Sequence, residues 1–294
     1  MRSYIIATAS TCDLDAQWLK AHHVPFISYP FIMDGKEYAD DCQSETKEIV
    51  YAKMRQGHTI TTSAISTFAY YTFFQRLMEN GGDVLYVDMS RAISSSISNC
   101  EKAIEQIQKD FPDQKIIFLD SYCITGGLGL LIKQLVQRHE DGMSLEETAA
   151  WGEEHKREYI HRFMVEDLQW LQRGGRLSNA SAFVGSLLAI KPMLYVTESG
   201  TLVAFDRAHG RRRCLRALLE SVLSDIAPYT GDEEITVISA DDREDCQKFI
   251  QEVRNFYPQL ANAHITITDL GPTICAHVGP DFLAIIYHGL KRVL

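Results

Sequence analysis

Short apolar runs rich in β-branched and aromatic residues alternate along the first half of the chain with longer segments of helical periodicity. Their length is typical of buried strands, and they occupy residues 4–7, 84–87 and 116–119. Between them, Phe68, Tyr71, Phe74 and Met78 recur at helical spacing, which places them on one face of a helix. The alternation predicts an α/β fold with a mostly parallel sheet in the N-terminal part.

The second half of the chain has a different pattern, with arginine-rich segments and signals for a hairpin. Ser144 and Glu147 have the spacing of a capping box, so we expect a helix over residues 145–159. The other predicted elements are a hairpin turn at 198–200, strands at 235–238, 264–268 and 282–287, and a helix at 242–255. We therefore predict two α/β domains, an N-terminal domain over residues 1–160 and a C-terminal domain over 161–294.

The length and composition agree with this division. The chain has 294 residues, of which 46% are hydrophobic and 23% charged, as in an ordinary globular protein with a sizeable core. Its 29 basic and 39 acidic residues give a formal charge of −10, which opposes a polyanion over most of the surface. General nucleic-acid binding is therefore excluded, and only a local basic patch could still bind a polyanion.

Targeting signals and metal-binding spacings are missing from the sequence. The apolar run near the N-terminus is too short for a signal peptide, and no segment has the character of a transmembrane span, so we expect a cytoplasmic protein. The seven cysteines include no C-x-x-C pair, which favours reduced, buried thiols. The histidines include no H-E-x-x-H spacing, and we predict no metal site.

Small hydroxyl and glycine residues follow three of the predicted strands, in the segments 8–11, 90–96 and 120–129. Because the carboxyl ends of parallel strands meet at one edge of a sheet, we expect these loops to converge on one crevice. Backbone N–H groups and short hydroxyls gathered there would bind an anion. Serine and threonine also cap helices at such positions, which is the alternative role for each hydroxyl taken singly.

Several known catalytic and nucleotide motifs are absent. The only Gly-Lys pair, Gly35-Lys36, is followed by Glu37 and is no P-loop, and neither G-x-G-x-x-G nor G-x-S-x-G occurs. Ser94 and His277 would suffice for a nucleophile and a base, but a serine and a histidine in a long chain are a weak signal. Two arginine groups, at residues 173–176 and 207–216, indicate either contact with phosphate or an acidic partner or solvated surface.

Taken in order, the motifs of this chain resemble those of the DegV family, fatty-acid-binding proteins that act as B subunits of bacterial fatty acid kinase. The resemblance covers nearly the whole chain. It rests on the segments 10–14, 61–63, 93–96, 120–129, 168–178, 190–192, 207–211, 271–272 and 276–280.

The resemblance implies a ligand tunnel between two α/β domains that buries one long-chain fatty acid. Ser94 and Thr62 would bind the carboxylate, with Thr61 as an adjacent candidate. Arg173 and His277 would lie near the head group and the docking surface, so the last segment of the chain would return toward the ligand. An ATP-dependent kinase subunit would be the partner, and this chain itself would be non-catalytic and need no cofactor.

Departures from the family pattern leave alternatives open. Ser95 replaces the glycine after the central serine, Ala64-Ile65 replaces Gln-Pro, and Asp281 near the head group would repel a ligand carboxylate. One alternative is a lipid carrier or sensor of the same fold that has no kinase partner. Another is a hydrolase that uses Ser94 and His277.

Overall fold

The computed structural model describes residues 3–79, 81–176, 190–222, 234–240 and 242–292. The strands are β1 (Tyr4–Ala9), β2 (Phe26–Ile27), β3 (Pro30–Met33), β4 (Lys36–Ala39), β5 (Ile60–Thr62), β6 (Asp83–Asp88), β7 (Ile116–Asp120), β8 (Tyr159–Met164), β9 (Ile190–Val196), β10 (Leu202–His209), β11 (Ile235–Ser239), β12 (Ile265–Asp269) and β13 (Leu283–His288). The helices are η1 (Ser10–Cys12), α1 (Ala16–Ala21), α2 (Ser44–Arg55), α3 (Thr67–Met78), α4 (Ser96–Asp110), α5 (Thr125–Glu140), α6 (Leu145–His155), η2 (Lys156–Glu158), α7 (Gln169–Arg173), α8 (Arg211–Ser221), α9 (Arg243–Phe256), η5 (Pro258–Leu260) and α10 (Pro272–Val278).

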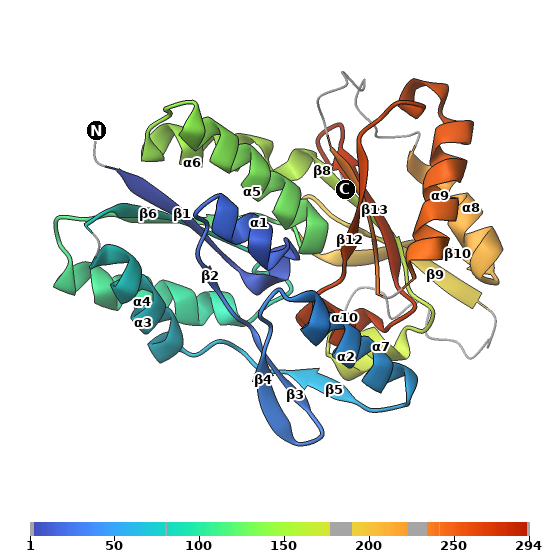
Figure 1. Cartoon of the computed structure of the whole chain (residues 1–294), viewed down its shortest axis with the longest axis horizontal. Helices are drawn as coiled ribbons and strands as arrows, with labels where there is room; N and C mark the ends of the chain where they lie inside the picture. Colours follow the sequence, from blue (N-terminus) through green and yellow to red (C-terminus); the bar gives the residue numbers. More distant parts are fainter. Residues whose placement is uncertain (1–2, 80, 177–189, 223–233, 241, 293–294) are drawn as a thin grey trace.

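A four-stranded parallel sheet of order β2-β1-β6-β7 forms the centre of the N-terminal half. Helices α3 and α4 cover one face of this sheet, and α5 and α6 cover the other (Figure 1). The expected strands and the helix that carries the Phe68 to Met78 stripe are confirmed. Because the strands are parallel, β1, β6 and β7 all end at the same edge, where the ligand of an open α/β sheet binds.

A six-stranded sheet of order β10-β9-β8-β13-β11-β12 forms the second half, with α8 and α9 on its outer side (Figure 1). The hairpin between β9 and β10, the strands β11 to β13 and the helix α9 confirm the sequence predictions. All strands before residue 121 belong to other sheets and all strands from Tyr159 on belong to this one. The division into domains 1–160 and 161–294 stays a prediction, and its boundary falls within β8.

Helix α5 lies between the two large sheets and contacts β1, β8 and β13. Its first turn approaches the second sheet so closely that only glycine fits. A Cβ on Gly127 would lie 2.1 Å from Nε2 of His161, and one on Gly126 would lie 2.6 Å from a methyl group of Ile238. These glycines therefore couple the two halves of the molecule.

The sequence prediction was wrong for two parts of the fold. Helix α6 has the predicted capping box at Ser144 but ends at His155, because Tyr159 already begins a strand that is buried along nearly its whole length. A small antiparallel sheet of order β4-β3-β5 was not predicted, since its strands are too short to show a period. Helix α10 packs against β3 and β5, and in this way a C-terminal segment reaches the N-terminal half.

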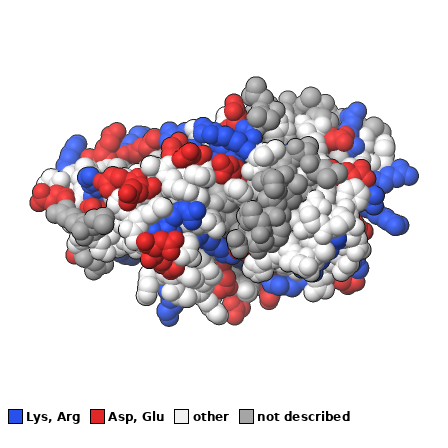
Figure 2. Space-filling model, turned by 90° about the horizontal axis from the view of Figure 1, so that it is seen from above, with Lys and Arg blue, Asp and Glu red and all other residues white. Residues whose placement is uncertain are grey.

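The distribution of surface charges and the state of the cysteines agree with the expectations from the sequence. Basic and acidic side chains are interspersed over the face that Figure 2 shows. All seven cysteines are free and buried, as predicted. Within the described ranges, no helix is both long and apolar enough to cross a membrane. Nor does this part of the chain gather three or more potential metal ligands into a group that could hold an ion.

Candidate functional site

A pocket of about 150 Å³ lies at the carboxyl edge of the parallel sheet, where segments from both halves of the chain meet. It is lined by Tyr29, Thr62, Ser63, Ala64, Met89, Ile93, Ser94, Ser95, Ser96, Arg176, Thr273, Ile274 and His277. We call it the head-group pocket. A water molecule takes about 30 Å³ in the liquid, so the pocket fits a group of a few heavy atoms.

Ser94 lies in the loop between β6 and α4, one of the three hydroxyl-rich loops noted in the sequence. Its side chain is 7% exposed, and its hydroxyl oxygen accepts a hydrogen bond from the backbone N–H of Ser96 at 3.2 Å. The same oxygen lies 3.1 Å from the hydroxyl of Tyr29. Tyr29 has one hydroxyl proton, so it donates either to Ser94, which leaves the Ser94 O–H proton free for a ligand, or to Asp88 at 3.4 Å, in which case Ser94 donates to Tyr29.

Tyr29 and Asp88 support Ser94 from behind, and neither was predicted as a site residue. Asp88 is fully buried, and its Oδ2 accepts hydrogen bonds from Tyr29, Tyr70 and Tyr86 at 3.4, 3.0 and 2.6 Å. Burial raises the pKa of Asp88 to about 6, although these donors act in the opposite direction. Burial also raises the pKa of Tyr29, so that its hydroxyl stays protonated as a donor.

Thr62 and His277 meet across the pocket from β5 and α10. The hydroxyl of Thr62 lies 2.8 Å from Nε2 of His277. Burial, and then the nearby charge of Arg176, lower the pKa of His277 to about 4, so the imidazole is neutral at physiological pH. Gly174 permits this geometry, because a Cβ there would lie 2.0 Å from Nδ1 of His277.

Arg176 supplies the positive charge of the pocket. Its Nε donates to the backbone carbonyl of Ile93 at 3.0 Å, and its Nη1 donates to that of Gly174 at 2.5 Å. The guanidinium is half-buried, which lowers its pKa from the usual value of arginine. These bonds tie the arginine to the Ser94 loop and fix its position before any ligand arrives.

Arg173, which the sequence placed near the head group, does not line this pocket. It is exposed, and its guanidinium carbon lies 4.3 Å from the centre of the Trp170 ring. It lines an adjacent hollow of about 250 Å³ together with Thr61, Thr62 and other residues. Thr61 lines that hollow but not the head-group pocket, whereas Thr62 lines both. Leu177 and Ser178, which complete the sequence motif, lie outside the described residues.

Only one of the three hydroxyl-rich loops lines the head-group pocket, so their predicted convergence was wrong for the other two. The hydroxyl of Ser10 accepts from the backbone N–H of Tyr29 at 3.0 Å, and that of Ser121 accepts from the N–H of Cys123 at 3.0 Å. Both hydroxyls are buried and bonded to backbone N–H groups, Ser121 within a local turn and Ser10 to a more distant segment, so their role is structural. Ser10 nevertheless helps to position Tyr29.

The expected repulsion of a ligand carboxylate by Asp281 and the alternative of a Ser94–His277 catalytic pair can both be compared with the structure. Asp281 is not among the lining residues, and its carboxylate forms an ion pair with Arg55 at 3.0 Å, which offsets its charge. The hydroxyl of Ser94 bonds with Tyr29, whereas Nε2 of His277 bonds with Thr62. This differs from the hydrogen-bonded nucleophile and base that a hydrolase requires.

The fold and site together describe an α/β protein with a small polar pocket, lined by hydroxyls, a neutral histidine and an arginine from both halves of the chain. A family model described as an uncharacterised protein of the DegV family matches residues 3–289. A DegV domain-containing protein of Clostridium perfringens is 32% identical over 290 residues, which make up 98% of each chain. The chain therefore belongs to the DegV family.

Solved structures share the whole fold. A DegV-family protein from Thermus thermophilus, reported to bind fatty acid, has a TM-score of 0.84 and 26% identity and covers 99% of this chain and 100% of its own. The fatty acid kinase B3 protein of Streptococcus pneumoniae, solved with linoleic acid, has a TM-score of 0.79 and 21% identity and covers 97% of this chain and 99% of its own. These likenesses confirm the predicted α/β architecture.

Proposed function

We propose that the protein binds one long-chain fatty acid and holds its carboxylate in the head-group pocket. One observation carries this proposal: Thr62 and Ser94, from separate elements, line a single small pocket with Arg176 and a neutral His277. Hydroxyl donors and a guanidinium are the groups that a carboxylate prefers in a partly buried site. The fatty acids reported for the Thermus thermophilus and Streptococcus pneumoniae proteins of this fold support the same ligand class.

The two ends of the ligand contribute differently to binding. The acyl tail supplies most of the affinity, since a chain of about sixteen carbons buried at ~0.8 kcal/mol per methylene contributes roughly 10 kcal/mol before ordering costs. The pocket of about 150 Å³ is too small for such a tail. The tail therefore needs further space, and the tunnel that the sequence predicts for it stays a prediction. The hydroxyls and Arg176 offset the cost of removing the carboxylate from water.

We further propose that the bound carboxylate is presented to a separate ATP-dependent kinase subunit, which converts it to an acyl phosphate. Arg176 lines the head-group pocket and also two adjoining hollows of about 400 and 250 Å³. The pocket thus borders surface into which a partner can reach. In this scheme the chain is a non-catalytic binding subunit in the cytoplasm, and its contribution to the reaction is to position the nucleophile for in-line transfer.

The binding proposal is tested by mass spectrometry of lipid that copurifies with the protein and by fatty acid titration of variants. Ser94→Ala removes one charge-assisted hydrogen bond, worth roughly 1.5–3 kcal/mol, so affinity should fall about ten-fold or more. Ser98→Ala is the matched control, because Ser98 is an exposed serine of α4 whose hydroxyl donates to the backbone carbonyl of Ser95 and which does not line the pocket. Absence of any fatty acid uptake would refute the proposal, and equal affinity of the two variants would remove Ser94 from the site.

The kinase step is tested separately by adding ATP and the cognate kinase subunit to the fatty acid complex. Formation of acyl phosphate supports the presentation role. Fatty acid binding without acyl phosphate would instead indicate the lipid carrier or sensor. Hydrolysis of an ester to its acid and alcohol by this chain alone would support the hydrolase, which the separate partners of Ser94 and His277 disfavour.

A further inference from the structure

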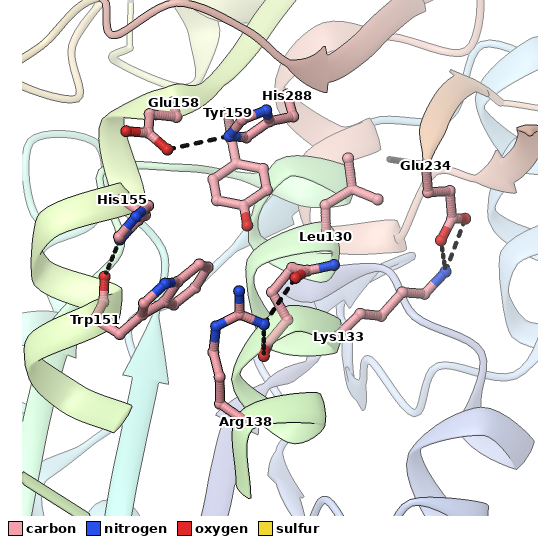
Figure 3. A pocket seen from close by; sticks show the side chains of 10 residues that line it. Leu130, Lys133, Arg138, Trp151, His155, Glu158, Tyr159, Glu234 and His288 are labelled. Atoms are coloured by element: carbon pink, nitrogen blue, oxygen red, sulfur yellow. Dashed lines mark hydrogen bonds and ion pairs between the residues drawn. The ribbon is translucent and has the colours of Figure 1, made fainter. Parts of the chain in front are cut away.

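A second cavity, of about 430 Å³, shares no lining residue with the head-group pocket (Figure 3). It lies where α5 and α6 meet β8 and β13, and it is lined by Leu130, Lys133, Gln134, Arg138, Trp151, His155, Glu158, Tyr159, Glu234 and His288. Its volume falls in the range of about 300–1,000 Å³ that is usual for small-molecule sites. Nothing in the proposed fatty acid function uses these residues.

The acidic side chains of this cavity already have basic partners. Glu158 lies 3.0 Å from Nε2 of His288, and both oxygens of Glu234 accept hydrogen bonds from Lys133, at 2.8 and 2.6 Å. The charge of Glu234 is therefore offset by Lys133, and the carboxylate of Glu158 is hydrogen-bonded to His288. A ligand does not need to neutralise them, and an anion is not excluded by them.

Arg138 is different, because its guanidinium has no carboxylate partner in the described part of the chain. Its Nη1 donates to the side-chain and backbone oxygens of Gln134 at 3.0 and 3.3 Å, and its central carbon lies 3.7 Å from the centre of the Trp151 ring. Its Nε is buried and has no hydrogen-bond partner among the described residues. The group is thus held in place while part of its donor capacity is unused.

The orientation of Trp151 and Tyr159 completes the site. His155 stacks on Trp151 with ring centres 4.3 Å apart and bonds to the backbone carbonyl of Trp151, which fixes the indole. The hydroxyl of Tyr159 points toward the Arg138 guanidinium across the cavity (Figure 3). A guanidinium and a phenol that face one space are two donors for a single anionic group. Beside them the cavity is lined by Leu130 and by the edge of Trp151, whose two faces are covered by Arg138 and His155.

We propose that this cavity is a second binding site, for a small organic anion whose carboxylate or phosphate group lies between Arg138 and Tyr159. The apolar body of the ligand packs against Leu130 and Trp151. The site is independent of the fatty acid pocket, since the lining residues differ. Its ligand class is defined by one anionic head on a short, apolar body.

The test uses the full chain and two probes, benzoate and phenyl phosphate, with benzyl alcohol as the uncharged control. The chain has three tryptophans, so its indole N–H signals are few, and loss of one signal in Trp151→Phe assigns the reporter. We expect benzoate or phenyl phosphate to shift the Trp151 signal in a saturable way, and benzyl alcohol to leave it unchanged. Ser94→Ala should bind the active probe as the unmodified protein does, which separates this site from the head-group pocket.

Arg138→Gln should raise the dissociation constant of the active probe roughly ten-fold or more, because a charge-assisted contact is lost. Arg216→Gln is the matched control, since Arg216 also lies over an aromatic ring on a helix but outside the cavity, and should change nothing. If Arg138→Gln does not fold, Tyr159→Phe removes the second donor and should weaken binding by a smaller factor. The proposal is overturned if neither anionic probe saturates, if benzyl alcohol acts equally, or if the folded variants bind unchanged.

Discussion

Two groups of buried carboxylates flank the head-group pocket, and they are stabilised in different ways. Asp88 lies behind Ser94 and is surrounded by neutral donors, three phenols and the backbone N–H of Met89. Asp13 and Asp40 lie behind α10 and share the positive charge of Lys47. Burial raises the pKa of all three acids. The first group therefore depends on hydrogen bonds from neutral donors, whereas the second has hydrogen bonds from Thr125 and Thr273 and, in addition, the nearby charge of Lys47.

Each group is connected to a different side of the pocket. The hydroxyl of Tyr29, one of the donors to Asp88, also contacts Ser94. Asp40 accepts a hydrogen bond from the hydroxyl of Thr273 at 2.7 Å, near the start of the helix that carries His277. A substitution of Asp88 is thus expected to affect the Ser94 side of the pocket, and a substitution of Asp40 the His277 side.

The largest effect is expected for Lys47→Met. Lys47 is 5% exposed, and it lowers the raised pKa values of Asp13 and Asp40. Without it, both pKa values rise further. Such groups contribute stability that is present below the unfolded pKa and is lost as the pH rises through the folded pKa, which for Asp13 is about 7. The variant should therefore lose roughly 3–5 kcal/mol above pH 8 and much less at pH 5, measured by urea unfolding.

Lys53→Met is the control for this prediction. Lys53 lies on the same helix, α2, but its ammonium group pairs with the exposed Asp34 at 3.0 Å. Exposed pairs contribute about 1 kcal/mol or less, so this variant should remain close to the unmodified protein at every pH. Equal losses in the two lysine variants, or a Lys47→Met loss that does not grow with pH, would contradict the role of Lys47 as the shared cation.

The sequence predicts the part of this arrangement that depends on local pattern. Residues 84–87 read as a strand, and the loop after them was identified as an anion receptor from its hydroxyls alone. The family motifs indicate Ser94 and Thr62, and these two residues line one pocket. These features lie within short stretches of chain, where period and motif carry the information.

The remainder depends on contacts between distant segments. Tyr29 meets Asp88 and Ser94 only after β1 and β6 have paired, and no local pattern marks it. The R-G-G-R segment contains both Arg173 and Arg176, and the sequence does not distinguish which of them lines the pocket. Gly175 has a φ of +70°, and this left-handed residue separates the exposed arginine from the one that lines the pocket. The amino-acid sequence of the motif does not by itself predict this left-handed conformation of Gly175.

A smaller, pH-dependent effect is expected for Asp88→Asn. Asparagine resembles the protonated acid, whose folded pKa is raised from 3.8 to about 6. The carboxyl group contributes stability that is complete below pH 4 and is lost as the pH rises through about 6. Between pH 4 and pH 7 the free energy of unfolding of the unmodified protein should therefore fall by up to about 3 kcal/mol relative to that of Asp88→Asn.

Urea unfolding over this pH range measures the difference. Asp110→Asn is the control, because Asp110 also accepts a bond from a tyrosine, Tyr71, at 2.7 Å, but at the surface. Its stability should follow that of the unmodified protein at each pH. A difference between Asp88→Asn and the unmodified protein that stays constant with pH would show that Asp88 has an ordinary pKa, and the contrast between the two buried groups would fail.

The smallest expected effect is that of Tyr29→Phe, and it isolates the link between Asp88 and the ligand. The change removes the 3.1 Å contact with Ser94 and the 3.4 Å contact with Asp88 but keeps the buried ring. One neutral hydrogen bond contributes about 0.5–1.5 kcal/mol, so fatty acid affinity should fall about two- to ten-fold with little loss of stability. Tyr71→Phe, which removes a surface phenol, should leave the titration unchanged. If Tyr29→Phe also binds unchanged, Ser94 is oriented by the backbone N–H of Ser96 alone, and Asp88 serves stability rather than the pocket.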